Sequence, residues 1–141
     1  MTVELSQERK ERLLLRAQQA RENAYVPYSH YRVGACLLCE DGTEYTGCNV
    51  ENAAYGSTIC AERTALLKAI SEGARRFAAI AVVGSGESIA YPCGACRQVL
   101  QEFNREMVVL SANSDLSKVH AMRLADLLPC GFGPADLGER E

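Results

Sequence analysis

Seven consecutive apolar residues, Phe77 to Val83, lie near the middle of the 141-residue chain and are followed by Gly84-Ser85-Gly86. The segment is far shorter than the roughly 20 apolar residues with which a helix spans a membrane. Because it is short, partly β-branched and free of polar residues, it is typical of a strand that is buried on both faces. Such a strand needs helices over both faces of its sheet, so this segment predicts an α/β fold.

The flanking segments supply these helices and further strands. Ser6 is a candidate helix cap, the apolar residues between Leu13 and Ala24 recur at helical spacing, and Pro27 ends the helix by about Tyr25. Next, the pattern predicts a strand over 33–39, a hairpin turn at Asp41-Gly42 and a strand over 43–48. A helix capped by Ser57 or Thr58 follows and ends near Glu72, before Gly73. After the strand at Phe77 to Val83, the pattern predicts a helix from Cys93 to about Phe103, a strand over 107–110, a short strand or loop with a short helix over 120–128, and an irregular tail. This order predicts helices packed on a mixed sheet, in a single domain over residues 1–141.

Two of the predicted helices, those starting at residues 57–58 and at Cys93, begin directly after a strand. Because crossover connections in such sheets are right-handed, both helix N-termini should lie at the same edge of the sheet. That edge is where α/β proteins place their ligands. We therefore expect the functional residues near these two helix starts.

Charge and cysteine content limit the classes of partner and the compartment. Fifteen Lys and Arg residues against 18 Asp and Glu give a net charge of −3, which argues against nucleic acid as a partner. The N-terminal region lacks the apolar stretch of a signal peptide and no segment suits a membrane span, so we expect a cytoplasmic protein without a membrane partner. In a reducing compartment, seven cysteines serve metal binding, catalysis or packing rather than disulfide bonds.

Three of the cysteines lie at predicted helix starts. Cys93 and Cys96 are three positions apart, which places both thiols on one helical face at a spacing that suits zinc. Cys60, 33 positions before Cys93, lies at the start of the preceding helix. The free N–H groups and the dipole at a helix start favour the thiolate, the form that binds metal. Three protein ligands leave a fourth position open for a water, as in catalytic zinc sites.

Glu62 and Arg63 follow Cys60 in the first turn of the same helix. Side chains two positions apart on a helix point in different directions, so Cys60 and Glu62 can both lie near one ion only if that ion lies beyond the helix end. A carboxylate that lies beside zinc without ligating it is the base that a bound water needs. Three thiolates give such a site a net negative charge, and Arg63 is a candidate donor that would reduce it.

Two other interpretations start from the same cysteines. Cys93-Gly-Ala-Cys96 at a helix start is also similar to a thioredoxin-type redox pair, but that interpretation gives Cys60 and Glu62 no role. A structural zinc site with four cysteines would need two thiols three positions apart on a strand, which point to opposite faces. The four remaining cysteines are predicted to be small packing residues: Cys36, Cys39, Cys48 and Cys130.

Longer motifs surround these residues over nearly the whole chain. They are Tyr25-x-Pro-Tyr-Ser-His30, Val33-Gly-Ala35, Gly47-Cys-Asn-Val-Glu-Asn52, Thr58-Ile-Cys-Ala-Glu-Arg-Thr64, Pro92-Cys-Gly-Ala-Cys-Arg-Gln98 and Phe132-Gly-Pro134. With them, the chain closely resembles the small zinc-dependent nucleoside cytidine deaminases, a family that carries the cysteine and glutamate signature of zinc nucleobase deaminases. The resemblance is much more specific than the ligand spacing alone.

The resemblance implies a fold, a cofactor and a reaction. The implied fold is a three-layer α/β/α sandwich with a mixed, about five-stranded sheet. One zinc ion per subunit would be bound by Cys60, Cys93 and Cys96, with Arg63 donating to the thiolates. The implied enzyme is a hydrolase of pyrimidine salvage, which converts cytidine and deoxycytidine to uridine and deoxyuridine with release of ammonia. Glu62 would transfer the protons.

The resemblance also implies substrate contacts. Asn49 and Glu51 match the family pair that binds the ribose hydroxyls. The backbone N–H of Ala61 would hold the cytosine oxygen, and the backbone carbonyl of Tyr91 its amino group. Tyr31 stands where many relatives have Phe near the base and sugar, so the ring is kept and a hydroxyl is added.

Family members of this length are usually homotetramers whose sites are completed by neighbouring subunits. Tyr55 and Phe132 match the aromatic positions used for this purpose. Two alternatives to the implied function remain: the same chemistry on a modified nucleoside or a polynucleotide, and a zinc protein with a closed four-ligand site and no turnover. The acidic charge balance counts against a polynucleotide.

Overall fold

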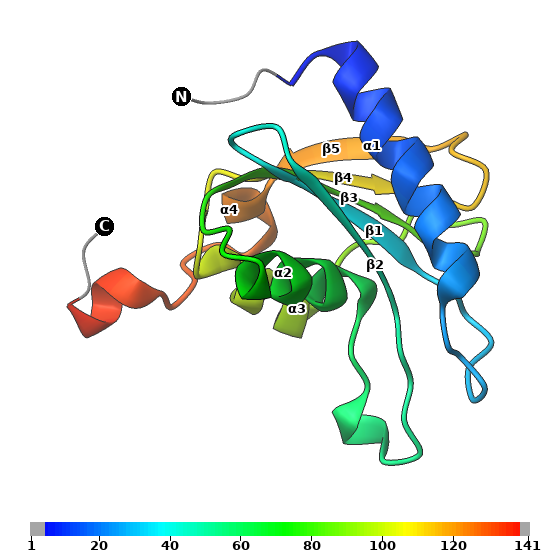
Figure 1. Cartoon of the computed structure of the whole chain (residues 1–141). Coiled ribbons are helices and arrows are strands. Elements are labelled where there is room, and N and C mark those ends of the chain that lie inside the picture. Colours follow the sequence, from blue (N-terminus) through cyan, green and yellow to red (C-terminus); the bar gives the residue numbers. More distant parts are fainter. Residues whose placement is uncertain (1–4, 139–141) are drawn as a thin grey trace.

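The computed structural model describes residues 5–138, which contain one five-stranded sheet with the strand order β2-β1-β3-β4-β5. The α-helices are α1 (Gln7–Ala20), α2 (Ala61–Ser71), α3 (Gly94–Gln101) and α4 (Leu124–Leu127), and the 3₁₀ helices are η1 (Arg21–Asn23), η2 (Tyr55–Ser57) and η3 (Pro134–Leu137). The strands are β1 (Gly34–Cys39), β2 (Glu44–Cys48), β3 (Phe77–Val83), β4 (Val108–Ala112) and β5 (Val119–Arg123). In Figure 1, α1 lies on one face of the sheet, and α2 and α3 lie on the other. No helix among the described residues is long and apolar enough to cross a membrane.

The sheet is mixed. β1 is antiparallel to both β2 and β3, β3 is parallel to β4, and β5 is antiparallel to β4. β2 and β3 therefore run in the same direction, and α2 and α3 each connect two strands of that direction. The starts of α2 and α3 consequently lie at one edge of the sheet, as predicted. The expected three-layer sandwich with a mixed five-stranded sheet is confirmed.

Alternating residues of β1 face the two helical layers. Cys36 and Leu38 pack in the cluster that α1 covers, together with Leu13. Leu37 and Cys39 pack in the cluster of α2 and α3 on the other face. All six residues of β1 are buried, as are most of β3, because both strands lie between two layers of helices. This explains why neither segment alternates polar and apolar residues.

The first helix begins where the sequence predicts. The Ser6 hydroxyl caps it by accepting a hydrogen bond from the backbone N–H of Arg9 at 3.1 Å. The helix continues through η1 to Asn23, close to the predicted end near Tyr25. The hairpin turn at Asp41-Gly42 is also confirmed, with Gly42 at a φ of 94°.

The second helix begins later than the sequence predicts. Its N-cap is Cys60, without a side-chain capping bond, and neither Ser57 nor Thr58 caps it. Ser57 ends η2 instead, and the Thr58 hydroxyl accepts from the backbone N–H of Asn52 at 3.3 Å. Neither site-bearing helix follows its strand directly, because loops over 49–60 and 84–93 intervene. The tail, predicted to be irregular, contains η3.

β2 and α2 approach each other closely at Gly47. A Cβ atom at this position would lie 2.5 Å from the backbone nitrogen of Ala65 and 2.6 Å from the carbonyl oxygen of Ala61. No side chain fits at these distances, so glycine allows the first turn of α2 to rest on the strand. The same contact determines how far Cys60 lies from the sheet.

Candidate active site

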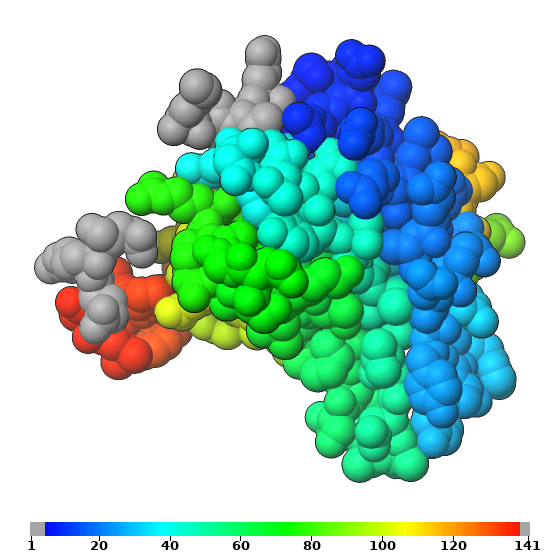
Figure 2. Space-filling model, viewed as in Figure 1, coloured from blue at the N-terminus to red at the C-terminus, as the bar shows by residue number. Residues whose placement is uncertain are grey.

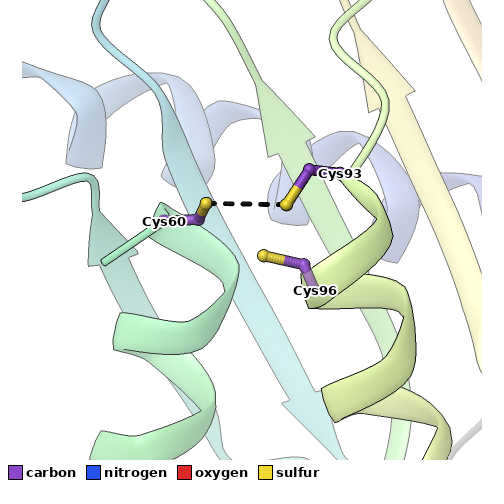
Figure 3. A group of neighbouring side chains, drawn as sticks. All are labelled: Cys60, Cys93 and Cys96. Atoms are coloured by element: carbon purple, nitrogen blue, oxygen red, sulfur yellow. Dashed lines mark hydrogen bonds between the residues drawn. The ribbon is translucent and has the colours of Figure 1, made fainter. Parts of the chain in front are cut away.

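Three thiols from two helix starts meet at one edge of the sheet. Cys60 is the N-cap of α2, Cys93 is the N-cap of α3, and Cys96 lies in the first turn of α3. Figure 3 shows the three side chains pointing toward one another across the space between the two helices. Their sulfur atoms all lie within 4.8 Å of one another, and the Sγ atoms of Cys60 and Cys93 are 3.7 Å apart. The structure thus brings together the three cysteines that the sequence selects.

The hydrogen bonds around Cys60 favour the ionised form of its thiol. Hydrogen bonds from Cys96, from Arg63 and from Cys93 lower the pKa of Cys60 to about 5, although its burial acts in the opposite direction. The Nη2 atom of Arg63 lies 3.4 Å from the Cys60 sulfur. The pKa of Cys96 is raised, because its thiol donates to Cys60 and is buried. Arg63 is therefore placed to balance the charge of a Cys60 thiolate.

The cluster fits zinc. A tetrahedral Zn²⁺ site with Zn–S bonds of about 2.3 Å places its sulfurs about 3.8 Å apart, close to the 3.7 Å between Cys60 and Cys93. Cys36 and Cys39 lie in separate clusters on the two faces of the sheet, so they cannot complete a four-cysteine site. Both are packed core thiols as predicted, whereas Cys130 is exposed, contrary to prediction. The redox interpretation of Cys93 and Cys96 leaves the third thiol of the cluster, that of Cys60, without a role.

Glu62 is buried beside the thiols, with 4% of its surface exposed. Burial raises the pKa of its carboxyl group to about 7, and the negative charge of Cys60 adds to the effect, while a backbone hydrogen bond and Arg63 oppose it. At neutral pH both the acid and the carboxylate are therefore populated. Ala61, also fully buried, is the first residue of α2, where backbone N–H groups have no partner within the helix.

Asn49 and Glu51 bind one and the same segment of the chain, residues 28–33. Asn49 accepts a hydrogen bond from the Val33 N–H through Oδ1 and donates to the Tyr31 carbonyl through Nδ2, both at 2.9 Å. Glu51 accepts from the backbone N–H groups of Tyr28 and Ser29, at 3.0 and 3.1 Å, and from the Ser29 hydroxyl. These bonds, that of the Ser29 hydroxyl above all, hold the pKa of Glu51 below its usual value.

This polar pair is connected to the metal cluster through the backbone. Val50, between Asn49 and Glu51, exchanges two backbone hydrogen bonds with Ile59, at 2.9 and 3.0 Å. Ile59 directly precedes Cys60. A cavity of about 320 Å³ lies next to the pair and is lined by Tyr28, Ser29, Glu51, Tyr55 and Thr58. The segment that carries Glu51 and this recess is therefore held to the residue that precedes the first cysteine of the cluster.

The four aromatic residues selected from the sequence do not converge within one chain. Tyr31 and Tyr91 are 41% and 42% exposed, and Tyr55 and Phe132 are 73% and 58% exposed. Tyr55 lies in η2 and contacts Tyr28, with ring centroids 5.7 Å apart. In Figures 1 and 2 the loop with η2 and the tail with η3 project from different sides of the body. Tyr55 lines the recess beside Glu51, whereas Phe132 of the same chain does not.

Several contacts that position these residues join parts of the chain that no sequence motif connects. The Tyr91 hydroxyl and the Nδ1 atom of His120 are 2.8 Å apart. Arg97 donates to the carbonyl of Pro92 at 2.7 Å and to that of Leu127 at 2.8 Å. Each contact joins residues 5 to 30 positions apart, and no local pattern in the sequence signals such a pairing.

A sheet with helices on both faces and three thiols gathered at two helix starts defines an α/β zinc protein. Comparison with known proteins identifies its family. Residues 7–112 match the family described as the cytidine and deoxycytidylate deaminase zinc-binding region. The chain belongs to this family, which confirms the resemblance found in the sequence and identifies zinc as its metal.

Relatives match nearly the whole chain. A cytidine deaminase of Sporosarcina psychrophila is 52% identical over 128 residues, which are 90% of this chain and 93% of that protein. A cytidine deaminase of Mycobacterium tuberculosis is 46% identical over 121 residues, 86% of this chain and 87% of that protein. The crystal structure of a cytidine deaminase from Burkholderia pseudomallei superimposes with a TM-score of 0.85 at 46% identity, over 91% of this chain and 100% of that chain.

Proposed function

We propose that this protein is a zinc-dependent cytidine deaminase that hydrolyses cytidine and deoxycytidine to uridine and deoxyuridine, with release of ammonia, in pyrimidine salvage. The observation that carries the proposal is the buried Glu62 beside the cluster of Cys60, Cys93 and Cys96. The similarity to cytidine deaminases over about nine-tenths of the chain supports the choice of substrate. The chain acts as one catalytic domain, and its reduced thiols suit the cytoplasm.

Glu62 performs the proton transfers. Zinc held by Cys60, Cys93 and Cys96 would supply a Lewis acid that makes a water molecule nucleophilic at neutral pH. Glu62 would accept a proton from that water and deliver it to N3 of the cytosine ring as C4 is attacked. It would then accept the remaining proton of the hydroxyl added at C4, which becomes the carbonyl, and deliver it to the amino group, which leaves as ammonia. A carboxyl with a pKa of about 7 suits this cycle, because it accepts and donates with similar ease at neutral pH.

Residues around the cluster orient the nucleoside. The free N–H of Ala61 at the start of α2 holds the cytosine oxygen, and the carbonyl of Tyr91 accepts from the amino group. Asn49 and Glu51 bind the ribose hydroxyls, a role that their fixed attachment to residues 28–33 supports. Tyr31 lies beside them and contacts the base and sugar.

We further propose a homotetramer in which neighbouring subunits complete each site. Tyr55 and Phe132 are the residues supplied in this way. Their high exposure and their location on segments that project from the body support this role.

Ammonia release from cytidine tests the proposed reaction. The wild-type protein is compared with Glu62→Ala at matched zinc content. We expect turnover by the wild type and a loss of at least about a thousandfold in the variant, because the proton carrier is gone. Zinc-loaded, folded wild type that releases no ammonia from either nucleoside would refute the proposal and favour a zinc protein without this turnover.

A further inference from the structure

The C-terminal tail is anchored to α3 through a single backbone carbonyl. The side-chain amides of Gln98 and Gln101 both donate to the carbonyl oxygen of Phe132, at 2.8 Å and 2.6 Å. Gln101 is buried, with 2% of its surface exposed, whereas Phe132 is 58% exposed. The two amides therefore fix the backbone of Phe132 while its ring stays accessible.

The glycines that flank Phe132, Gly131 and Gly133, make room for the buried amide of Gln101. A Cβ atom at Gly131 would lie 2.8 Å from Cδ of Gln101, and one at Gly133 would lie 3.3 Å from its Nε2. The N–H of Gly133 also donates to the carboxylate of Asp136 at 2.9 Å. The backbone is thus held on both sides of the exposed ring, and a side chain at Gly131 would displace the amide.

Core packing alone does not account for the amide of Gln101. Its Oε1 atom is buried and has no hydrogen-bond partner among residues 5–138. A buried polar atom without a partner costs free energy, and an apolar side chain of similar length would avoid this cost. The bond that Nε2 makes to Phe132 is the contact that only the amide supplies.

We propose that Gln101 is a positioning residue that presents the ring of Phe132 to the active site of a neighbouring subunit. The inference rests on the proposed function, in which Phe132 completes a neighbour's nucleoside site. Gln98, one turn earlier on α3, shares the task. The helix that carries Cys93 and Cys96 at its start therefore also directs, from its last turn, an aromatic ring that serves another site.

A double-mutant cycle in the full-length, zinc-loaded protein tests this role. The variants are Gln101→Met, which keeps the length of the side chain but lacks the amide, Phe132→Ala, and the double variant. We expect Gln101→Met to raise KM for cytidine about 3- to 10-fold, the effect of one lost hydrogen bond, with kcat and zinc content little changed. In the Phe132→Ala background the same substitution should leave KM unchanged, because the ring that it positions is absent.

Gln18→Met serves as the matched control. Gln18 also holds a loop carbonyl through its amide, that of Ser114 at 3.0 Å, but it lies on α1, on the opposite face of the sheet. KM should not change in this variant. Amide hydrogen exchange over residues 131–137 gives a second readout, which should be faster in Gln101→Met than in the wild type.

The outcomes separate this proposal from the proposed function. Wild type that does not deaminate cytidine refutes both. If the wild type is active and Phe132→Ala raises KM, but Gln101→Met changes neither KM nor exchange in the tail, only the positioning role is refuted. An equal rise in KM with and without the Phe132 ring also refutes it, because Gln101 would then act through some other residue.

Discussion

Two glutamates whose side chains are little exposed, one on each side of the sheet, have opposite electrostatic environments. The Glu44 side chain, 4% exposed, bonds to Arg9, Arg12 and Arg16 of α1 at 2.8, 3.2 and 2.6 Å. Its burial would raise its pKa, but hydrogen bonds from Arg16 and Arg9 outweigh burial and lower it. Glu62 has its pKa raised to about 7, and the nearest cation, Arg63, binds the Cys60 sulfur instead.

The difference shows how the same side chain acquires a structural or a chemical role. On the α1 face, cations along the side of a helix hold a carboxylate in its charged form and attach the helix to edge strand β2. On the other face, the N-termini of α2 and α3 lie at the cysteine cluster. The cation there, Arg63, contacts the sulfur of Cys60 rather than the carboxyl group of Glu62. Glu62 remains free to change its protonation state. The following predictions test this contrast, from the largest expected effect to the smallest.

The largest expected effect is the loss of zinc. Cys96→Ala removes one of three ligands and should abolish both zinc binding and cytidine turnover, because two thiols hold zinc much less tightly. Cys36→Ala is the matched control, since it removes a buried thiol on the α1 face. It should retain one zinc per chain by metal analysis. Equal zinc content in the two variants would contradict the assignment of the ligands.

Exchanging each glutamate for its amide separates their roles. Glu44→Gln should lower the free energy of unfolding by about 2 kcal/mol, because three arginines lose their charged partner, and should leave kcat near the wild-type value. Glu62→Gln should abolish turnover without lowering stability, since it removes a carboxyl whose ionised form is disfavoured by burial. Denaturant unfolding and ammonia release measure both. A stability loss in Glu62→Gln that matches that of Glu44→Gln would contradict the comparison.

The contribution of Glu44 depends on pH with a definite sign. Its pKa in the folded protein is below the ordinary value of 4.5, so its ion pairs stabilise the protein above that pH. As the pH falls through the lower folded value, the carboxylate is protonated and the contribution is lost. The difference in unfolding free energy between wild type and Glu44→Gln should therefore be constant near neutral pH and decrease below pH 4.5. A difference that grows on acidification would contradict this account.

A small effect is expected from His120 on β5. His120→Phe keeps an aromatic ring against Tyr91 but removes the hydrogen bond to its hydroxyl. We expect KM for cytidine to rise about 2- to 3-fold with kcat unchanged, because the residue before Pro92 becomes less well oriented. Tyr91→Phe should have an effect of the same size, and the double variant no larger one. Additive effects of the two substitutions would show that the hydrogen bond is irrelevant.

Local patterns in the sequence predicted many of the strands, helix ends and ligand cysteines of this molecule. β3 begins and ends at the predicted residues, because an apolar run that follows two arginines and stops at Gly84 admits few alternatives. Gly73 has a φ of 99° and follows α2, as its position suggested. The three ligand cysteines were also found, since their helix-start positions and spacing are visible in the sequence.

Contacts between distant residues account for what was missed. Ser57 and Thr58 are better capping residues than Cys60, yet α2 starts at Ala61, where its backbone meets Gly47. Tertiary packing thus overrides a local preference. The exposed Cys130 belongs to a tail whose course depends on the amides of Gln98 and Gln101, and this connection leaves no periodic pattern in the sequence.

The close approach at Gly47 also has a consequence for how this enzyme can vary over evolution. The position carries no functional group, yet any side chain there would push the first turn of α2, and with it the first zinc ligand, away from the sheet. Selection for activity in a large library of variants should therefore retain glycine at position 47 about as strictly as it retains Glu62. Gly47, which has no reactive group, is then under the same purifying selection as Glu62, which transfers the protons.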